Sequence, residues 1–184
     1  MRRAVFLDRD GTLIEEANYL SEIRSLTFFP YTIDAVRLLN QSGFAVVVVT
    51  NQAGIARGIV KEAFVAEAHA VLDARLAVGG ARIDGYYYCP HHPDGSIAAF
   101  RKDCDCRKPR PGQLRQAAAD LDLDLAGSFV VGDRWSDVDA GDAVGARGVL
   151  VRTGHGRQSE SENRASATVT DNLIAAVAWI LRQP

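Results

Sequence analysis

The sequence predicts an α/β fold with a doubly wound, mostly parallel sheet, and three observations lead to this expectation. Short apolar runs rich in valine and aromatic residues alternate with helical patterns along the 184 residues. The run FAVVVV at residues 44–49 has no polar alternation, which is typical of a strand buried on both faces between helices. Glycine and proline stand at the ends of several helical patterns. We therefore expect one domain over residues 1–184, with right-handed crossovers between parallel strands.

The individual elements follow in order from these patterns. The expected strands are residues 3–7, 44–49, 83–88, 128–131 and 148–151, and the expected helices are residues 32–40, 61–78, 111–121, 136–144 and 171–181. Pro111 suits the first turn of a helix, where no N–H donor is needed, while Gly43 and Gly79 suit helix exits. We expect RTGHG at 152–156 to form a turn and the polar segment 154–166 to be a surface loop. The long irregular insertion at residues 89–110 needs a functional or structural reason.

Composition and charge narrow the class of protein. The formal net charge of −2 and the scattered basic residues argue against nucleic acid or an anionic membrane as a partner. No apolar stretch reaches the ~20 residues that span a bilayer, and the N-terminal MRRAVFLDRD meets acidic residues too early for a signal peptide. The 3 cysteines, without a secretory signal, favour a reducing compartment. We expect a soluble, cytoplasmic protein and, because no apolar stripe is left over, a monomer.

Polar side chains stand where several expected strands end. In a parallel sheet these carboxyl ends lie at one edge, where ligands bind, so the side chains should converge there. A single aspartate after a strand is usually a helix cap or a turn residue, but that explanation does not cover the whole set. The set comprises Asp8 and Asp10 after the first strand, Thr50 after the second, Asp133 and Asp137 after the fourth, and Lys108 just past the insertion.

These residue types fit phosphoryl transfer. A carboxylate can attack phosphorus, and a second carboxylate can protonate the leaving oxygen and later activate water. Mg²⁺ binds a few carboxylates together with substrate oxygens, while a cation and hydrogen-bond donors hold the phosphoryl oxygens. Gly11 lets the backbone approach a phosphate closely. The residues that can supply nucleophile, acid/base, metal ligand, cation and hydroxyl are, in that order, Asp8, Asp10, Asp133, Lys108 and Thr50.

The same segments resemble a known family. DRDGT, TNQ, RKP and GDRWSD resemble, in the same order, the four motifs of haloacid dehalogenase superfamily phosphatases. The resemblance implies that Asp8 is the nucleophile and Asp10 the general acid/base. It implies that Thr50 and Lys108 clamp the phosphoryl group. The Mg²⁺ ligands that it implies are Asp8, the backbone carbonyl of Asp10, and Asp133.

The insertion holds all 3 cysteines of the chain, beside two histidines. The spacing C-x-H-x12-C-x-C offers three thiolates and one imidazole, the closed tetrahedral set that structural zinc uses. We therefore predict a structural Zn²⁺ that braces residues 89–110, with Cys89, His91, Cys104 and Cys106 as ligands. His92 in place of His91, free thiols, and a redox pair at Cys104 and Cys106 remain as alternatives.

The zinc loop narrows the resemblance. YYYCPHHPDG, CDCRKPRPG, VVVTNQAGIARG and VLVRTG are similar to the heptose-bisphosphate phosphatases, a zinc-loop group without a large cap domain. This implies removal of the 7-phosphate of a heptose 1,7-bisphosphate, in the synthesis of bacterial lipopolysaccharide or surface-glycan precursors. Because Lys108 closely follows Cys106, zinc would also fix the approach of Arg107 and Lys108 to the phosphate. The substrate residues expected here are Gly11, Glu16, Ala17, Asn18, Tyr19, Asn51, Gln52, Ala53, Arg107 and Arg134.

Two other functions and several contacts stay open at this point. Histidinol-phosphate phosphatases share much of the pattern, and a zinc-braced binding protein without catalysis belongs to a different class. Arg134 stands where a lysine is expected, and the two cations differ in geometry. Arg57, in GIARG, could reach a second phosphate or could be a solvated loop arginine. The residues do not decide which anomer at C1 is preferred.

Overall fold

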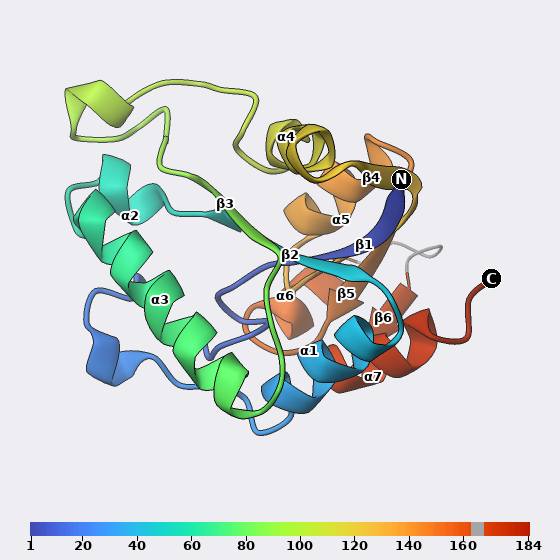
Figure 1. The fold of residues 1–184 in the computed structure, drawn as a ribbon. Coiled ribbons are helices and arrows are strands. Elements are labelled where there is room, and N and C mark those ends of the chain that lie inside the picture. The colour runs from blue at the N-terminus through green and yellow to red at the C-terminus, as the bar shows by residue number, and fades with distance from the viewer. Residues whose placement is uncertain (163–167) are drawn as a thin grey trace.

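The structure, a computed structural model that describes residues 1–162 and 168–184, contains a six-stranded sheet in which all neighbouring strands are parallel. The strand order is β3-β2-β1-β4-β5-β6 (Figure 1). This confirms the predicted parallel α/β fold. The strands are β1 (Arg2–Leu7), β2 (Ala45–Asn51), β3 (Gly85–Cys89), β4 (Leu123–Gly132), β5 (Arg147–Val151) and β6 (Thr168–Thr170).

Helices cover both faces of the sheet, as Figure 1 shows. Alternate residues of a strand point to opposite faces, so β1 sends Val5 and Leu7 to one core and Ala4 and Phe6 to the other. The first core contains buried residues of α1 (Thr32–Gln41), α3 (Glu62–Val78) and α7 (Leu173–Ile180). The second contains those of α4 (Gly112–Leu121) and α5 (Trp135–Asp142). Burial on both faces explains why β2 is apolar at every position from 45 to 49.

The ends of the helices differ slightly from the expectation, for local reasons. Pro111 is the N-cap of α4 and not its first residue. Gly79 caps α3 with a negative φ, and the left-handed conformation that ends the turn falls on Gly80, at φ +70°. The last helix begins at Leu173 because the Asn172 side chain accepts a hydrogen bond from the Ala175 N–H, at 3.1 Å.

Part of the segment 154–166 was wrongly expected to be a surface loop. Residues Gly156–Glu160 form α6, in which Gly156 and Ser159 are buried. The Trp135 indole donates to the Ser159 carbonyl at 2.6 Å, and the Ser159 hydroxyl donates to the Asp133 carbonyl at 3.0 Å. These bonds tie α6 to the start of α5. Residues 163–166 of the expected loop lie outside the described residues.

Two further elements extend what the sequence predicted. The strand expected at 128–131 begins already at Leu123, because its first residues pair with β1 before a register shift between Arg3 and Val5. Ser128 accepts the Ala4 N–H at 2.8 Å beside this irregularity. A short helix, α2 (Ala53–Ala56), follows β2 directly.

Strand β1 lies at the topological switch point of the sheet. It pairs with β2 on one side and β4 on the other, so the carboxyl ends of these three strands lie together. The connection from β1 to α1, described in full, contains the short helix η1 (Ile23–Ser25) and no inserted domain. The insertion after β3 contains η2 (Ala98–Phe100). The switch point therefore opens to solvent without a cap built from the first connection.

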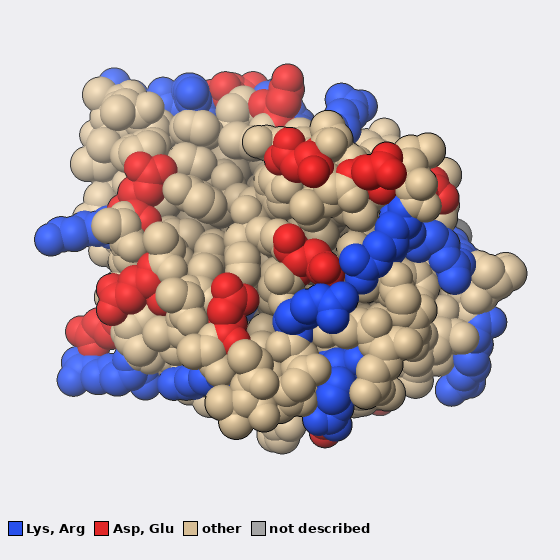
Figure 2. All heavy atoms as spheres, in the orientation of Figure 1, with Lys and Arg blue, Asp and Glu red and all other residues tan. Residues whose placement is uncertain are grey.

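The surface carries charges of both signs. On the face drawn in Figure 2, basic and acidic side chains are interspersed. Among the described residues, no helix is long and apolar enough to cross a membrane.

Candidate active site

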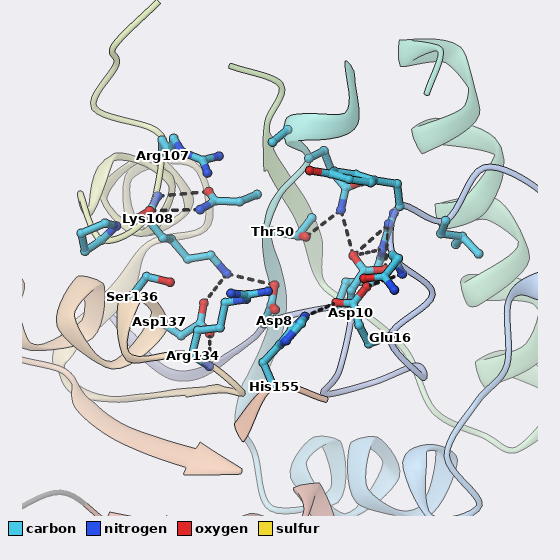
Figure 3. Close-up of a pocket in the computed structure, with 18 of the residues that line it drawn as sticks. Asp8, Asp10, Glu16, Thr50, Arg107, Lys108, Arg134, Ser136, Asp137 and His155 are labelled. Carbon is cyan, nitrogen blue, oxygen red and sulfur yellow. Dashed lines mark hydrogen bonds and ion pairs between the residues drawn. The ribbon is translucent and has the colours of Figure 1, made fainter. Parts of the chain in front are cut away.

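Asp8 lies at the carboxyl end of β1, where its N–H donates to the Val131 carbonyl of β4 at 2.9 Å. Its carboxylate receives a hydrogen bond from the Lys108 ammonium, with 2.9 Å between Oδ1 and Nζ (Figure 3). The same Nζ lies 2.6 Å from Asp137 Oδ1 and 2.6 Å from the Val49 carbonyl. Lys108 is 4% exposed, so its charge is fixed between two carboxylates and a carbonyl.

Asp133 completes a group of three buried carboxylates with Asp8 and Asp137, whose ligand atoms lie within 4.8 Å of one another. Its Oδ2 accepts the His155 N–H at 2.7 Å. Its Oδ1 is buried and has no hydrogen-bond partner among the described residues. An unsatisfied buried carboxylate oxygen is costly, and a hard divalent cation is the partner that such a group prefers. The donor set therefore fits Mg²⁺.

The pKa values of Asp8 and Asp133 reflect the burial of several carboxylates close together. Burial, opposed by the Lys108 charge and reinforced by Asp137, raises the pKa of Asp8 to about 7. Burial, together with the charges of Asp8 and Asp137, raises the pKa of Asp133 to about 8. A cation held by these carboxylates would favour their ionised forms.

Asp10 borders the same cavity, but its carboxylate is held by other partners. Oδ2 accepts a hydrogen bond from Gln52 Nε2 at 2.9 Å, and both oxygens contact the Arg9 guanidinium. Gln52 Nε2 also donates to the Thr50 hydroxyl at 2.9 Å. Gln52 therefore spans the side chains expected to be the acid/base and the phosphoryl clamp.

The end of β2 fixes the backbone of Lys108. Asn51 Oδ1 accepts the Lys108 N–H at 3.1 Å, and Asn51 Nδ2 donates to the Lys108 carbonyl at 3.0 Å. Gln113, from α4, donates to the Cys106 carbonyl at 2.7 Å. Asn51 was expected to contact substrate; the structure gives it this positioning role as well.

Glycine is needed at position 11 for a steric reason that differs from the expected one. Its φ is +81°, and a Cβ there would lie 2.3 Å from Asp133 Oδ2 and 3.1 Å from the Gly154 Cα. The Thr153 hydroxyl donates to the Gly11 carbonyl at 2.6 Å. Gly11 therefore makes room for Asp133 and for the turn after β5.

A cavity of about 570 Å³ at the carboxyl edge of the sheet is lined by Asp8, Asp10, Thr50, Lys108 and Asp137, whereas the buried Asp133 does not line it. Of the expected substrate residues, Gly11 and Ala17 do not line it. Those that do are Glu16, Asn18, Tyr19, Asn51, Gln52, Ala53, Arg107 and Arg134. The cavity is also lined by residues that were not expected there: Arg9, Leu20, Pro109, Ser136 and His155, with Arg57, whose role was open. His155 follows β5 at the same edge of the sheet, and this position after a strand is the sequence signal that could have predicted it in the cavity lining.

The first connection shapes one wall of the cavity with strained backbone. Asn18 and Tyr19 have φ of +48° and +72°, which non-glycine residues adopt rarely. The Asn18 N–H donates to Glu16 Oε1 at 2.8 Å, and Glu16 Oε2 lies 3.5 Å from His155 Nε2. The Arg57 guanidinium lies 5.7 Å from the centre of the Tyr19 ring.

The insertion gathers its thiols around one point. The ligand atoms of Cys89, His91, Cys104 and Cys106 lie within 4.8 Å of one another. Cys89 and Cys104 sulfurs are 3.5 Å apart, and His91 Nδ1 is 3.3 Å from the Cys106 sulfur. His92 points elsewhere, since its Nδ1 accepts the Asp94 N–H at 3.1 Å and its Nε2 lies 3.3 Å from Arg57 Nη2. The cluster is compatible with a tetrahedral Zn²⁺ held by three thiolates and His91.

Comparisons with known proteins find relatives of this chain in sequence and in structure. Residues 105–176 match the family model described as HAD-hydrolase-like. The chain is 48% identical over 180 residues to a D-glycero-beta-D-manno-heptose-1,7-bisphosphate 7-phosphatase of Yersinia pestis, with 97% of this chain and 89% of that protein covered. The protein of the same name from Escherichia coli K12 is 49% identical over 164 residues, with 88% and 85% covered.

A solved structure has the same fold over its whole length. The crystal structure of the D,D-heptose 1,7-bisphosphate phosphatase of B. bronchiseptica, complexed with magnesium and phosphate, superposes with a TM-score of 0.88 at 32% identity. The match covers 99% of each chain.

Proposed function

The chain belongs to the haloacid dehalogenase-like hydrolases and, within them, to the family of heptose-1,7-bisphosphate 7-phosphatases, and from this premise we propose its substrate, cofactors and mechanism. It is a phosphomonoester hydrolase that acts on a sugar bisphosphate. The substrate that we propose is a D-glycero-D-manno-heptose 1,7-bisphosphate, from which the enzyme releases the 7-phosphate for bacterial surface-glycan precursors. The proposed cofactors are a catalytic Mg²⁺ and a structural Zn²⁺.

One observation carries the proposal of catalysis. Asp8, Lys108 and Asp133 come from separate parts of the chain, yet Lys108 Nζ lies 2.9 Å from Asp8 and the carboxylates of Asp8 and Asp133 belong to one group within 4.8 Å. The proposed nucleophile and phosphate-binding cation thus line a cavity of about 570 Å³, and the proposed metal ligand Asp133 is buried beside the nucleophile. This arrangement supports attack on a phosphate monoester. A binding protein without catalysis would have little reason to bury so much charge.

In the first step that we propose, Asp8 attacks phosphorus and forms an aspartyl phosphate. Asp8 and Asp133 would hold Mg²⁺ together with the backbone carbonyl of Asp10, and the ion would supply charge neutralisation between the two approaching anions. Lys108 and the Thr50 hydroxyl hold the equatorial phosphoryl oxygens. Asp137 keeps Lys108 in place through the 2.6 Å contact.

Asp10 handles the proton in both steps. It donates a proton to the sugar oxygen as the ester bond breaks, and it accepts a proton from the water that attacks the aspartyl phosphate. Its place beside the cavity, 18% exposed at the side chain, is consistent with access to both.

The arginines of the cavity lining suit a second phosphate. Arg57 and Arg107 both line the cavity, and Arg57 Nη2 lies 3.3 Å from His92 Nε2. Arg107 is further fixed by donating to the His91 carbonyl at 3.3 Å. Two guanidiniums in the lining of the same cavity support recognition of a second phosphate.

The proposed Zn²⁺ links the stability of the insertion to this recognition. Arg107 and Lys108 directly follow Cys106, one of the four cluster residues. The metal would therefore hold the segment that carries both cations.

Phosphate release tests the substrate. With Mg²⁺ present, kcat/KM is compared for both anomers of the heptose 1,7-bisphosphate and for histidinol phosphate. We expect one bisphosphate to be preferred by more than ~100-fold, about 2.7 kcal/mol of transition-state discrimination. A preference for histidinol phosphate would replace the substrate and retain the Asp8 chemistry, while no turnover of any of the three would overturn the substrate.

A further inference from the structure

Arg9, between the two aspartates of the first motif, is the largest fully buried side chain of the described residues. It is 1% exposed, and a buried guanidinium is costly unless a charge and hydrogen bonds compensate it. Its carboxylate partner is Asp10: Nε donates to Oδ2 at 3.0 Å, and Nη2 donates to Oδ1 at 3.1 Å. This two-point contact fixes both the position and the rotation of the carboxylate.

The contacts leave the two oxygens of Asp10 unequal. Oδ2 receives Arg9 Nε and also Gln52 Nε2, at 2.9 Å, and lies 2.9 Å from Arg9 Nη2. Oδ1 receives a single donor, Arg9 Nη2. Since each carboxylate oxygen can accept two hydrogen bonds, Oδ1 keeps the free acceptor position that a transferred proton needs.

His69, a buried residue of α3, lies close enough to Arg9 for the guanidinium charge to act on its ring. Arg9 Nη1 and His69 Nε2 are both buried, and neither has a hydrogen-bond partner within residues 1–162 and 168–184. Burial, followed by the charge of Arg9, lowers the pKa of His69 to about 4, so the ring is neutral and one of its nitrogens can accept. The His69 ring stacks on Tyr86 at 4.3 Å between centroids, and Tyr86 in turn donates to Asp73 at 2.7 Å. His69 therefore stays uncharged near the guanidinium and adds no second positive charge to the buried pair.

We propose that Arg9 is a positioning residue for the acid/base Asp10. The inference rests on the proposed function, because it takes Asp10 to transfer the proton. A carboxylate that is displaced by about 1 Å, or free to rotate, can lose ~100-fold in rate. Arg9 touches Asp10 and not the reacting phosphorus, so its loss should affect the bond-breaking step in proportion to the need for a proton.

The experiment compares two esters with different leaving groups under single-turnover conditions, with the full-length enzyme in excess. The sugar bisphosphate expels an alkoxide that must be protonated, whereas nitrophenolate leaves p-nitrophenyl phosphate without a proton. For Arg9→Met we expect cleavage of the sugar bisphosphate to slow by ~100-fold and that of the aryl ester by less than ~5-fold. Steady-state KM for the bisphosphate should stay within ~3-fold.

A second variant keeps the test decisive if Arg9→Met folds poorly. Arg9→Lys retains the charge without the fork and should recover part of the bisphosphate rate. Arg75→Met is the control, because Arg75 is an exposed arginine of α3 that donates to the Leu26 carbonyl and lies outside the cavity lining. It should slow neither ester.

The outcomes separate this inference from the proposed function. Equal slowing of the two esters by Arg9→Met, or no slowing of either, would overturn the role of Arg9. Failure of the wild-type enzyme to cleave either ester would instead overturn the proposed function.

Discussion

Replacing Gly11 by alanine would place a methyl group against the side chain of Asp133. The new Cβ would lie 2.3 Å from Asp133 Oδ2 and 2.8 Å from its Cγ. Asp133 cannot simply rotate away, because Oδ2 accepts the His155 N–H at 2.7 Å. The backbone cannot shift freely either, since the Gly154 Cα lies 3.1 Å from the same position.

The expected cost has two parts. A non-glycine residue at the left-handed φ of +81° costs about 1–2 kcal/mol. Overpacking against Asp133 and Gly154 adds about 1–3 kcal/mol. We therefore expect Gly11→Ala to lower the free energy of unfolding by about 2–5 kcal/mol. The displaced Asp133 should weaken the apparent affinity for Mg²⁺ by ~10–100-fold.

Gly43→Ala separates the two parts. Gly43 has nearly the same backbone conformation, φ +86°, and a Cβ there would meet nothing within 4 Å. This variant should lose only the backbone cost, about 1–2 kcal/mol, and should bind Mg²⁺ as the wild type does. Urea unfolding gives the stabilities, and the Mg²⁺ dependence of phosphate release gives the apparent affinity.

Equal behaviour of the two variants would refute this reasoning. If Gly11→Ala matched Gly43→Ala both in unfolding free energy and in Mg²⁺ dependence, Asp133 would not be confined as the distances indicate. Its assignment as a metal ligand would then lose its structural support.

Three further predictions concern buried charge and metal. Lys108→Met leaves Asp8 and Asp137 without their cation, which should lower the free energy of unfolding by about 3–5 kcal/mol at pH 8. The loss should be smaller at pH 5, because a raised carboxyl pKa gives stability that is lost as pH rises. Equal losses in urea unfolding at both pH values would contradict this. His69 has a lowered pKa of about 4 against an ordinary 6.5, so the unfolded chain binds the extra proton and the free energy of unfolding falls as pH drops from 6.5 to 4. Relative to His69→Phe, the wild type should lose about 3 kcal/mol of stability over this window. Parallel pH profiles of stability for the two proteins would contradict this prediction. Cys106→Ser should lose zinc and melt at a lower temperature, while His92→Gln should keep its zinc, as measured by metal content and thermal unfolding; zinc loss in both variants would place His92 among the ligands.

The sheet could be predicted from the sequence where burial alone determines the pattern. Residues 45–49 are apolar throughout because both faces of β2 are covered. The edge strand β6 could not be predicted in this way, since its three residues are half-buried and pairing with β5 defines it. The helix α6 escaped for a similar reason: its sequence is polar, and its fixed position depends on contacts with Trp135 and Asp133.

The residues of the site also fall into those that the sequence could predict and those that it could not. The sequence could predict that three residues lie together. Asp8 and Asp133 follow parallel strands, whose carboxyl ends lie at one edge of the sheet, and Lys108 belongs to one of the recognised motifs. The burial of Arg9 could not be expected, since arginine is normally exposed and its place in the folded chain depends on contacts that the sequence does not show. The reason for Gly11 was also hidden, because its neighbour Asp133 is distant in sequence.

The most direct test of the proposed mechanism is to trap phosphate on the protein. The enzyme is mixed with substrate carrying a radiolabelled 7-phosphate, quenched in acid within a single turnover, and digested for peptide mapping. The account predicts transient label on the peptide that contains Asp8, formed at least as fast as kcat and absent from Asp8→Asn. Turnover at the full wild-type rate with no label on the protein, or with label on another residue, would contradict nucleophilic catalysis by Asp8.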